Sequence, residues 1–223
     1  MPINAHPPYK ISNLMILASF MAAMAGYINT ILLIEFGFPV SQMTGVMSIL
    51  SESSFYANAE LSLKALIVLF GFIGGAFLSG MLIGDRQHRQ DKRFALGMTI
   101  LSLLLLISAV LAILIHPLTL LTTSIACGLQ NALIANYRGL QMRTTHVTGI
   151  VTDIGVYLAK LLRHKTWPWQ AWLLVLIVLS FLIGGLFGIQ AFKWLEGASL
   201  FIPALACLPL AVAWLRLEKA PAA

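Results

Sequence analysis

Long apolar runs alternate with short polar stretches along this chain of 223 residues. An α-helix needs about 20 mostly apolar residues to cross the roughly 30 Å hydrocarbon core of a bilayer. Six segments are at or near that length, namely 11–34, 62–84, 95–116, 118–136, 171–192 and 198–215. The pattern therefore predicts an all-α membrane protein with six transmembrane helices, which form a single membrane domain over residues 1–223 in a lipid bilayer.

Two of these segments carry residues that are unusual in a membrane helix. The fourth contains several polar side chains, among them Thr122, Gln130 and Asn131. The sixth contains Pro203 and Pro209. Proline removes a backbone hydrogen bond, so we expect the sixth helix to be kinked or broken at these residues.

The first segment has two interpretations. Lys10 and the small residues at 23–25, followed by Gly26, are compatible with a cleaved signal peptide. We favour a transmembrane helix, because the apolar run continues to Ile34 and because the segment has a counterpart later in the chain.

Composition and charge narrow the class of protein further. Hydrophobic residues make up 59% of the chain and charged residues 10%, whereas soluble domains are about one quarter charged. The net charge of +6 does not indicate a nucleic-acid partner, because six passes place every Lys and Arg except Lys64 and Lys193 on one side. Cytoplasmic loops carry such an excess. We therefore predict a multi-pass protein of the bacterial plasma (inner) membrane with both termini in the cytoplasm.

The two halves of the chain resemble each other in three places. "AGYINT" matches "CGLQNA", "SQMTG" matches "THVTG", and "FIGG" matches "LIGG", at 25–30 and 127–132, 41–45 and 145–149, and 72–75 and 182–185. The matches keep the same order and define a first repeat over 11–116 and a second over 118–215. Each repeat holds three membrane segments, an odd number, so the second enters the membrane from the opposite face. The sequence thus predicts a 3+3 inverted repeat.

The two Thr-Gly pairs are the centre of the functional prediction. Inverted repeats of transporters place the binding site near the membrane midplane, where broken helices from both repeats meet. A Thr-Gly pair that starts a short re-entrant helix provides a hydroxyl to cap free N–H groups and a glycine for close backbone approach. The predicted substrate-binding residues here are Thr44, Gly45, Thr145, Thr148 and Gly149.

The strings "GYINT", "SQMTG", "GLQNA" and "TTHVTGIVTDIG" resemble the YoaK-like family of bacterial integral membrane proteins. The resemblance covers most of the chain, residues 20–190, and implies a six-spanning protein without an agreed biochemical activity. Two positions differ from the family pattern: Asn29 stands where an Asp is common, and Val46 where an Asn is common. If that Asp binds a proton or cation in relatives, the difference implies that this coupling is lost here.

Polar residues near the Thr-Gly pairs complete the candidate site. Asn29, Gln130 and Asn131 either line a polar cavity or form hydrogen bonds between helices. Asp153 is either a solute ligand within the membrane or an acid stabilised by the first turn of a helix. The glycines of the second and fifth segments indicate close helix packing rather than a ligand site.

The predicted function is a transporter or channel-like carrier of an unidentified small solute, and not an enzyme. The five histidines show no metal-ligand spacing, and no Gly-x-Ser-x-Gly motif occurs, so we predict neither a metal nor a cofactor. A non-transporting membrane scaffold or sensor is the main alternative, and an intramembrane enzyme is a further one. A homo-oligomer is compatible with six short segments.

Overall fold

A computed structural model gives the fold of residues 11–83, 92–135 and 145–217. Within these ranges the regular structure is helical and consists of α1 (Ile11–Phe36), α2 (Met43–Phe55), α3 (Ala59–Ile83), α4 (Lys92–Ile113), α5 (Leu118–Ala135), α6 (Val147–His164), α7 (Trp169–Leu195), the 3₁₀-helix η1 (Glu196–Leu200) and α8 (Phe201–Leu217). Each predicted apolar segment corresponds to one helix, and the predicted all-α class is confirmed.

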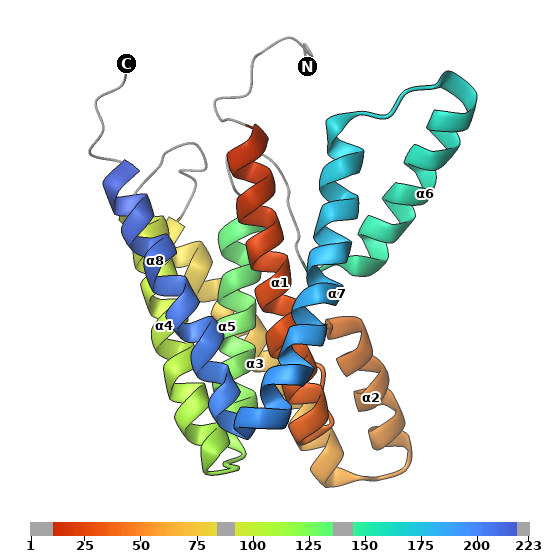
Figure 1. The fold of residues 1–223 in the computed structure, drawn as a ribbon. Coiled ribbons are helices and arrows are strands. Elements are labelled where there is room, and N and C mark those ends of the chain that lie inside the picture. The colour runs from red at the N-terminus through yellow and green to blue at the C-terminus, as the bar shows by residue number, and fades with distance from the viewer. Residues whose placement is uncertain (1–10, 84–91, 136–144, 218–223) are drawn as a thin grey trace.

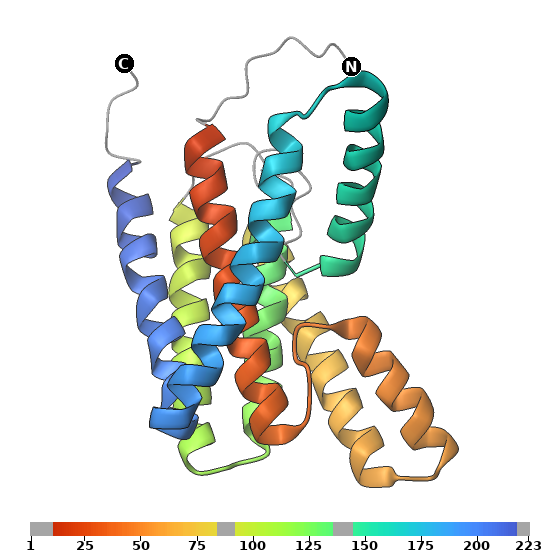
Figure 2. The same ribbon diagram turned by 45° about the vertical axis from the view of Figure 1, so that its right-hand side comes forward.

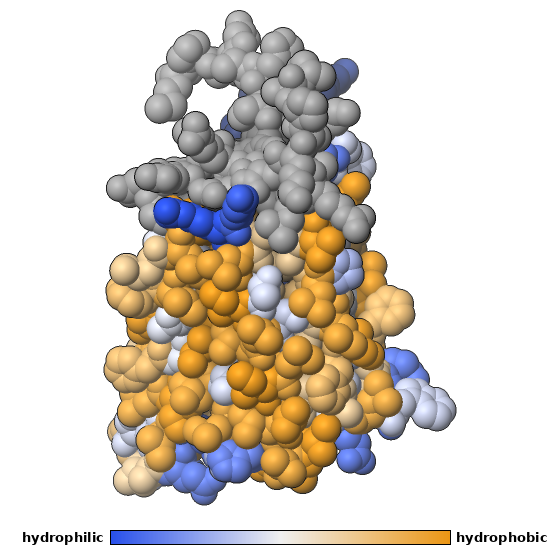
Figure 3. All heavy atoms as spheres, turned by 90° about the vertical axis from the view of Figure 1, so that its left-hand side faces the viewer, coloured by the Kyte–Doolittle hydropathy of each residue, from blue (hydrophilic) through white to orange (hydrophobic). Residues whose placement is uncertain are grey.

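Several helices have the length and composition of membrane spans. In the described ranges, four apolar stretches are long enough to cross a membrane: Ile11–Phe36, Ala59–Ile83, Lys92–Ile113 and Trp169–Val212. The last stretch contains α7 and α8, which run in opposite directions (Figure 1), and α5 is a shorter apolar helix. The surface over α4 and α8 is almost continuously hydrophobic (Figure 3), which suits contact with lipid. These are the features of a multi-pass membrane protein.

The helices pack in pairs that join distant parts of the chain. α1 lies against α7, α3 against α5, and α4 against α8 (Figures 1 and 2). Each pair therefore combines one helix from the first half of the chain with one from the second half. The largest buried side chains include Met21 and Ile28 of α1 and Leu129 and Leu133 of α5, so the core lies between the two halves.

Glycines allow α1 and α7 to approach closely. A side chain at Gly26 would collide with the backbone carbonyl of Phe181, and a side chain at Gly184 would collide with the backbone carbonyl of Ala23. Such close backbone contact is typical of small-residue faces in membrane helices. The helix α1 is continuous across Gly26 as far as Phe36, which is the behaviour expected of a transmembrane helix.

The contact between α3 and α5 repeats this arrangement. A side chain at Gly128 would collide with the backbone carbonyl of Phe72, and one at Gly75 would collide with that of Ile125. Gly26 and Gly128 are equivalent in the matched strings of the two halves. The predicted packing role of the glycines in the second and fifth segments is confirmed at Gly75 and Gly184, but a side chain at Gly74 or Gly80 would meet nothing within 4 Å.

These contacts correct one detail of the predicted repeat. Gly75 in α3 takes the role that Gly184 takes in α7, so residues 72–75 correspond to 181–184 and not to the similar letters at 182–185. Both helices contain two consecutive glycines, and α3 uses the second of them where α7 uses the first. The register between the two helices is set by the direction in which each glycine faces its neighbouring helix. The sequence alone does not give this direction.

The short helices α2 and α6 lie at the edge of the bundle. α2 packs on α3, and α6 packs on α7. Both helices begin at mid-height, and they run to opposite ends of the molecule (Figures 1 and 2). Together they extend along the height of the bundle, with their N-terminal ends toward the middle.

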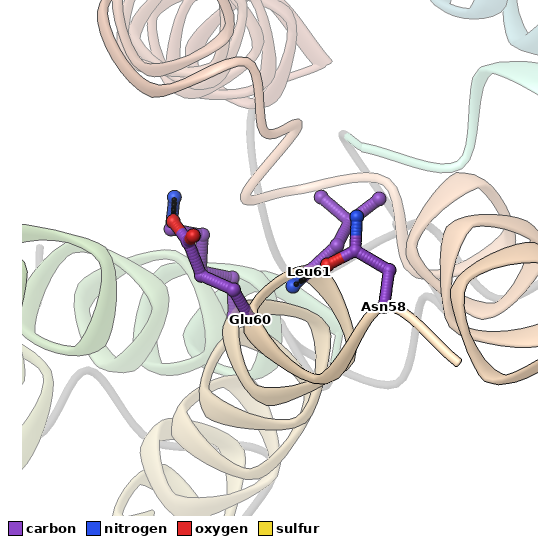
Figure 4. A network of polar contacts seen from close by, with 4 residues as sticks. Asn58, Glu60 and Leu61 are labelled. Carbon is purple, nitrogen blue, oxygen red and sulfur yellow. Dashed lines mark hydrogen bonds and ion pairs between the residues drawn. The ribbon is translucent and has the colours of Figure 1, made fainter. Parts of the chain in front are cut away.

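The turn from α2 into α3 ends in a helix cap. The Asn58 Oδ1 atom accepts a hydrogen bond from the backbone N–H of Leu61 at 3.1 Å, as N-cap residues do. Figure 4 shows Asn58, Glu60 and Leu61 at this first turn. Glu60 also forms an exposed ion pair with Lys64, with 2.6 Å between Oε1 and Nζ. The cap fixes the point at which the chain turns from α2 into the long helix.

The prolines do not break α8. The helix runs without interruption from Phe201 to Leu217, with Pro209 inside it. Pro203 lies in the first turn, where backbone N–H groups have no partner within the helix. Pro209 removes one backbone hydrogen bond, and packing of α8 on α4 holds the helix together around it. Of the two expected outcomes, a break at the prolines is therefore wrong, and a kink stays a prediction.

The two ends of the bundle differ in charge. Among the described residues, the end that contains the start of α4 and the end of α6 carries Lys92, Arg93, Lys160, Arg163 and Lys165. The opposite end, with the start of α3 and the ends of α1, α2 and α7, carries Glu35, Glu52, Glu60 and Glu196 beside Lys64 and Lys193. We call these the basic end and the acidic end.

Candidate functional site

The two Thr-Gly segments are far apart in the sequence but lie around one cavity. The cavity has a volume of about 530 Å³ and is lined by residues 41–45, residues 145–149 and Phe72 of α3. It lies where α2 and α6 begin, at mid-height of the bundle (Figure 2). The predicted site residues that meet here are Thr44, Gly45, Thr145, Thr148 and Gly149.

Both segments start their helices in the same way. α2 begins at Met43 and α6 at Val147, which is the third residue of each five-residue string. The residues before them have similar backbone angles, with φ −115° and ψ 76° at Gln42 and φ −87° and ψ 57° at His146. The two segments are therefore similar in backbone conformation as well as in sequence.

Thr44 and Thr148 do not act as caps, which corrects the predicted role of their hydroxyls. Each threonine is already the second residue of its helix, and the cap residues Gln42 and His146 make no side-chain cap hydrogen bond. The N–H groups of a first helical turn have no partner within the helix. The cavity wall thus contains hydrogen-bond donors and the positive ends of two helix dipoles.

Asn29 anchors the first segment to α1. Its Oδ1 atom accepts hydrogen bonds from the backbone N–H and the hydroxyl of Ser41, at 3.0 and 2.9 Å. Asn29 and Ser41 are 3% and 4% exposed, so these bonds are shielded from solvent. Ser41 lines the cavity, whereas Asn29 lies behind it. Asn29 therefore positions the cavity wall.

Asn131 anchors the second segment in the same manner. Its Oδ1 atom accepts a hydrogen bond from the Thr145 hydroxyl at 2.9 Å. Asn131 holds the place in "CGLQNA" that Asn29 holds in "AGYINT", and Thr145 corresponds to Ser41. Neither of the two predicted roles describes these bonds, because each asparagine joins its helix to the segment that follows and does not line the cavity.

Gln130 has the second of its two predicted roles, a hydrogen bond between helices. Its Nε2 atom donates to the backbone carbonyl of Met21 in α1 at 2.7 Å. Its Oε1 atom is buried without a hydrogen-bond partner among the described residues. Gln130 is not part of the cavity lining, so it connects α5 to α1.

Asp153 also lies outside the cavity lining. It is exposed on α6, six residues after the start of the helix. This position is beyond the first turn, where a helix dipole stabilises an acid most. His146, by contrast, is exposed and lines the cavity.

The sequence prediction missed six residues of the lining, namely Ser41, Gln42, Met43, Phe72, His146 and Val147. Ser41 had a signal, because a hydroxyl residue stands first in both "SQMTG" and "THVTG". Phe72 had none, since an aromatic residue in an apolar helix is ordinarily a packing residue. Its place in the cavity lining depends on how α3 packs against the rest of the bundle.

The lining defines what the cavity can bind. Its described side chains are hydroxyls, one amide, one imidazole and a few apolar groups, and no carboxylate of the described residues lines it. No group of three or more His, Cys, Asp or Glu in the described ranges could hold a metal ion. The cavity therefore suits a small solute that accepts hydrogen bonds from N–H and O–H donors.

A second cavity, of about 570 Å³, lies between α1, α7 and α8. Its lining is almost entirely apolar and includes Phe20, Met24, Phe187, Trp194 and Ile202. Such a surface matches hydrocarbon and offers little to orient a polar solute. The cavity at the Thr-Gly segments is therefore the candidate functional site.

The family comparison agrees with the extent of this architecture. A family model described as "Protein of unknown function (DUF1275)" matches residues 17–213. The matched range includes both Thr-Gly segments and both anchoring asparagines. No curated protein and no solved structure matches the chain. The comparison thus gives a family without a solute or a reaction.

Proposed function

This chain belongs to the DUF1275 family of unknown function, in agreement with the YoaK-like resemblance of its motifs, and we propose that it carries a small polar solute across a membrane. The protein acts as a carrier or channel and performs no chemical reaction on the solute. The solute binds in the cavity between the two Thr-Gly segments. The proposal rests on the shape and symmetry of this site.

The proposed topology has six spans arranged as a 3+3 inverted repeat. Three equivalences between the halves support it: the glycine contacts, the asparagine anchors and the matching starts of α2 and α6. The opposite directions of α2 and α6 (Figure 1) support it further. Equivalent helices run in opposite directions when the second half of the chain enters the membrane from the opposite face.

The observation that carries the proposal is the meeting of two helix starts around one cavity at mid-height. In secondary transporters built from inverted repeats, half-helix N-termini point at the solute near the membrane midplane. Irregular backbone at that depth is tolerated only against protein or a water-filled cavity. Residues 41–42 and 145–146, which line the cavity just before α2 and α6, are irregular backbone of this kind.

The proposed location is the bacterial plasma membrane with the basic end in the cytoplasm. The charge difference between the two ends supports this orientation, because Lys and Arg accumulate in cytoplasmic loops. α6 then lies in the cytoplasmic half of the protein and α2 in the outer half. A solute bound in the cavity has one of these short helices toward each side.

A transport assay on reconstituted protein tests the proposal. Proteoliposomes are exposed to gradients of glycerol, urea, formate and acetate, and volume change is followed by light scattering. We expect at least one solute to enter faster than into empty liposomes. Thr44→Leu and Thr148→Leu should each lower that rate at least tenfold, because an apolar side chain replaces a hydroxyl in the lining.

The matched control is Thr166→Leu, which makes the same change in the exposed segment between α6 and α7. Its rate should equal that of the unmodified protein. Unchanged flux in both Thr-Gly variants would remove these segments from the pathway. Absence of flux for every solute, together with a partner that co-purifies in fixed ratio, would favour the scaffold or sensor alternative.

A further inference from the structure

The cavity lies at mid-height, so a solute needs a path to it from each end. Two exposed helix faces lead away from the cavity in the required directions. α2 has 13 residues and α6 has 18, which correspond to lengths of about 20 and 27 Å. Each helix is therefore long enough to reach from the middle of a bilayer to its surface.

The α2 stripe consists of Thr44, Ser48 and Glu52. Residues four apart lie above one another on the same helix face. Because Thr44 lines the cavity, Ser48 and Glu52 continue its face toward the acidic end. All three residues are exposed.

The α6 stripe consists of Thr148, Thr152, Asp153, Lys160 and Arg163. It begins in the cavity at Thr148 and continues to the basic end. All five residues are exposed. Val156 and Ala159 are exposed apolar residues on the same side of the helix, and they lie between Asp153 and the basic residues.

The two stripes correspond to each other at their inner ends. Thr44 is equivalent to Thr148, and Ser48 is equivalent to Thr152. The Ser48 hydroxyl donates to the carbonyl of Thr44 at 3.2 Å, and the Thr152 hydroxyl donates to that of Thr148 at 3.0 Å. The hydroxyls thus continue the cavity lining by one helical turn in each direction.

Packing leaves both stripes uncovered. α6 packs through Ile150, which is buried, and through the partly buried Ile154 and Tyr157. α2 packs through the buried Val46 and Ser53. The stripes lie on other faces of these helices, and the described helices do not cover them.

The depth of these exposed polar groups in the membrane indicates that they face water. Ser48, Thr152 and Asp153 lie five to six residues from the helix starts, which is about 7–9 Å from the cavity. A hydrocarbon core extends roughly 15 Å on either side of its midplane. A carboxylate such as that of Asp153 is costly in lipid at this depth, and such residues face water or protein.

We propose that the α2 and α6 stripes line two aqueous routes that connect the central cavity to the acidic and the basic end. This inference rests on the proposed function, because it assigns the access routes of the same site. Ser48 and Glu52 face the route on one side, and Thr152 and Asp153 face the route on the other. Apolar faces of the same helices contact lipid.

Single cysteines test the routes without knowledge of the solute. The native Cys127 and Cys207 are buried, so they contribute little background. Ser48→Cys and Thr152→Cys are introduced separately, and the protein is reconstituted in liposomes. Labelling by a small membrane-impermeant thiosulfonate is then measured. We expect Ser48→Cys to react from the acidic end and Thr152→Cys from the basic end.

The matched controls are the preceding residues, Met47→Cys and Val151→Cys. Met47 and Val151 are 46% and 52% exposed, lie at nearly the same depth, and point about 100° away around the helix. We expect each stripe cysteine to react at least tenfold faster than its control. Equal rates for stripe and control, or no reaction at the stripe, would overturn the proposal.

The result separates this inference from the proposed function. Labelling at residues 48 and 152 that leaves transport unchanged would support water access but count against transport through the cavity. If transport persists while both stripe cysteines stay unreactive, the proposed carrier function is retained and the two proposed routes are rejected. Labelling that blocks transport supports both.

Discussion

At the scale of single residues, the two asparagines explain how irregular backbone is held at the cavity. Asn29 and Asn131 each use Oδ1 to bind a hydroxyl residue, Ser41 or Thr145, at the start of a Thr-Gly segment. These bonds are buried, where an unpaired polar group is expensive. The asparagines therefore determine where α2 and α6 begin.

A double-mutant cycle on Asn131 and Thr145 tests this anchor. Asn131→Ala and Thr145→Ala each remove one partner of the 2.9 Å hydrogen bond. We expect each to lower the free energy of unfolding, with a coupling energy of about 0.6–1.7 kcal/mol between them. Unfolding in detergent, followed by intrinsic fluorescence, measures the four proteins. Additive effects of the two substitutions would show that the side chains do not act together.

The sequence allowed a prediction of the site residues by type but not of their individual roles. Repetition of "SQMTG" and "THVTG" was enough to place Thr44 and Thr148 in one site, because equivalent segments of two halves meet near their symmetry axis. It could not show that Asn29 lies behind the wall, or that Gln130 binds the Met21 carbonyl. Those roles depend on the distances between helices.

At the scale of helices, backbone contact at glycine sets the position of each pair. Gly26 and Gly184 join α1 to α7, and Gly75 and Gly128 join α3 to α5. Hydropathy predicted every one of these helices, since spanning length is visible in a single sequence. The one-residue shift between 72–75 and 181–184 was not predictable, because adjacent glycines differ only in the direction that they face.

Adjacent glycines in α3 provide a test of this packing. At Gly75 an added Cβ would collide with the carbonyl of Ile125, whereas at Gly74 it would meet nothing within 4 Å. Gly75→Ala should destabilise the protein by about 1–3 kcal/mol through overpacking. Gly74→Ala should leave stability unchanged or raise it, because alanine is the better helix former. Melting temperatures in detergent that fall equally would contradict the assigned register.

At the scale of the whole molecule, charge and the direction of the short helices define two sides. The basic end contains the end of α6, and the acidic end contains the end of α2 (Figure 1). Sequence predicted this separation from the distribution of Lys and Arg alone. In the proposed orientation, with positive charge on the cytoplasmic side, α6 faces the cell interior.

Labelling in intact cells checks the orientation. Tyr56→Cys follows α2 at the acidic end, and Thr166→Cys follows α6 at the basic end; both positions are exposed. An impermeant maleimide should label Tyr56→Cys in intact cells and Thr166→Cys only after permeabilisation. The reverse pattern would invert the protein in the membrane, and labelling of both in intact cells would contradict the proposed topology.

The crossed pairing of α1 with α7 and of α3 with α5 has a consequence for how such a protein can be divided. The glycine faces of each half pack only against helices of the other half. A polypeptide cut between α4 and α5 therefore leaves each fragment with two unpacked glycine faces, on α1 and α3 or on α5 and α7. A fragment expressed by itself could cover them only with a sister copy inserted upside down. Neither fragment should therefore accumulate when it is expressed alone, and co-expression of the two fragments should restore the accumulation of both.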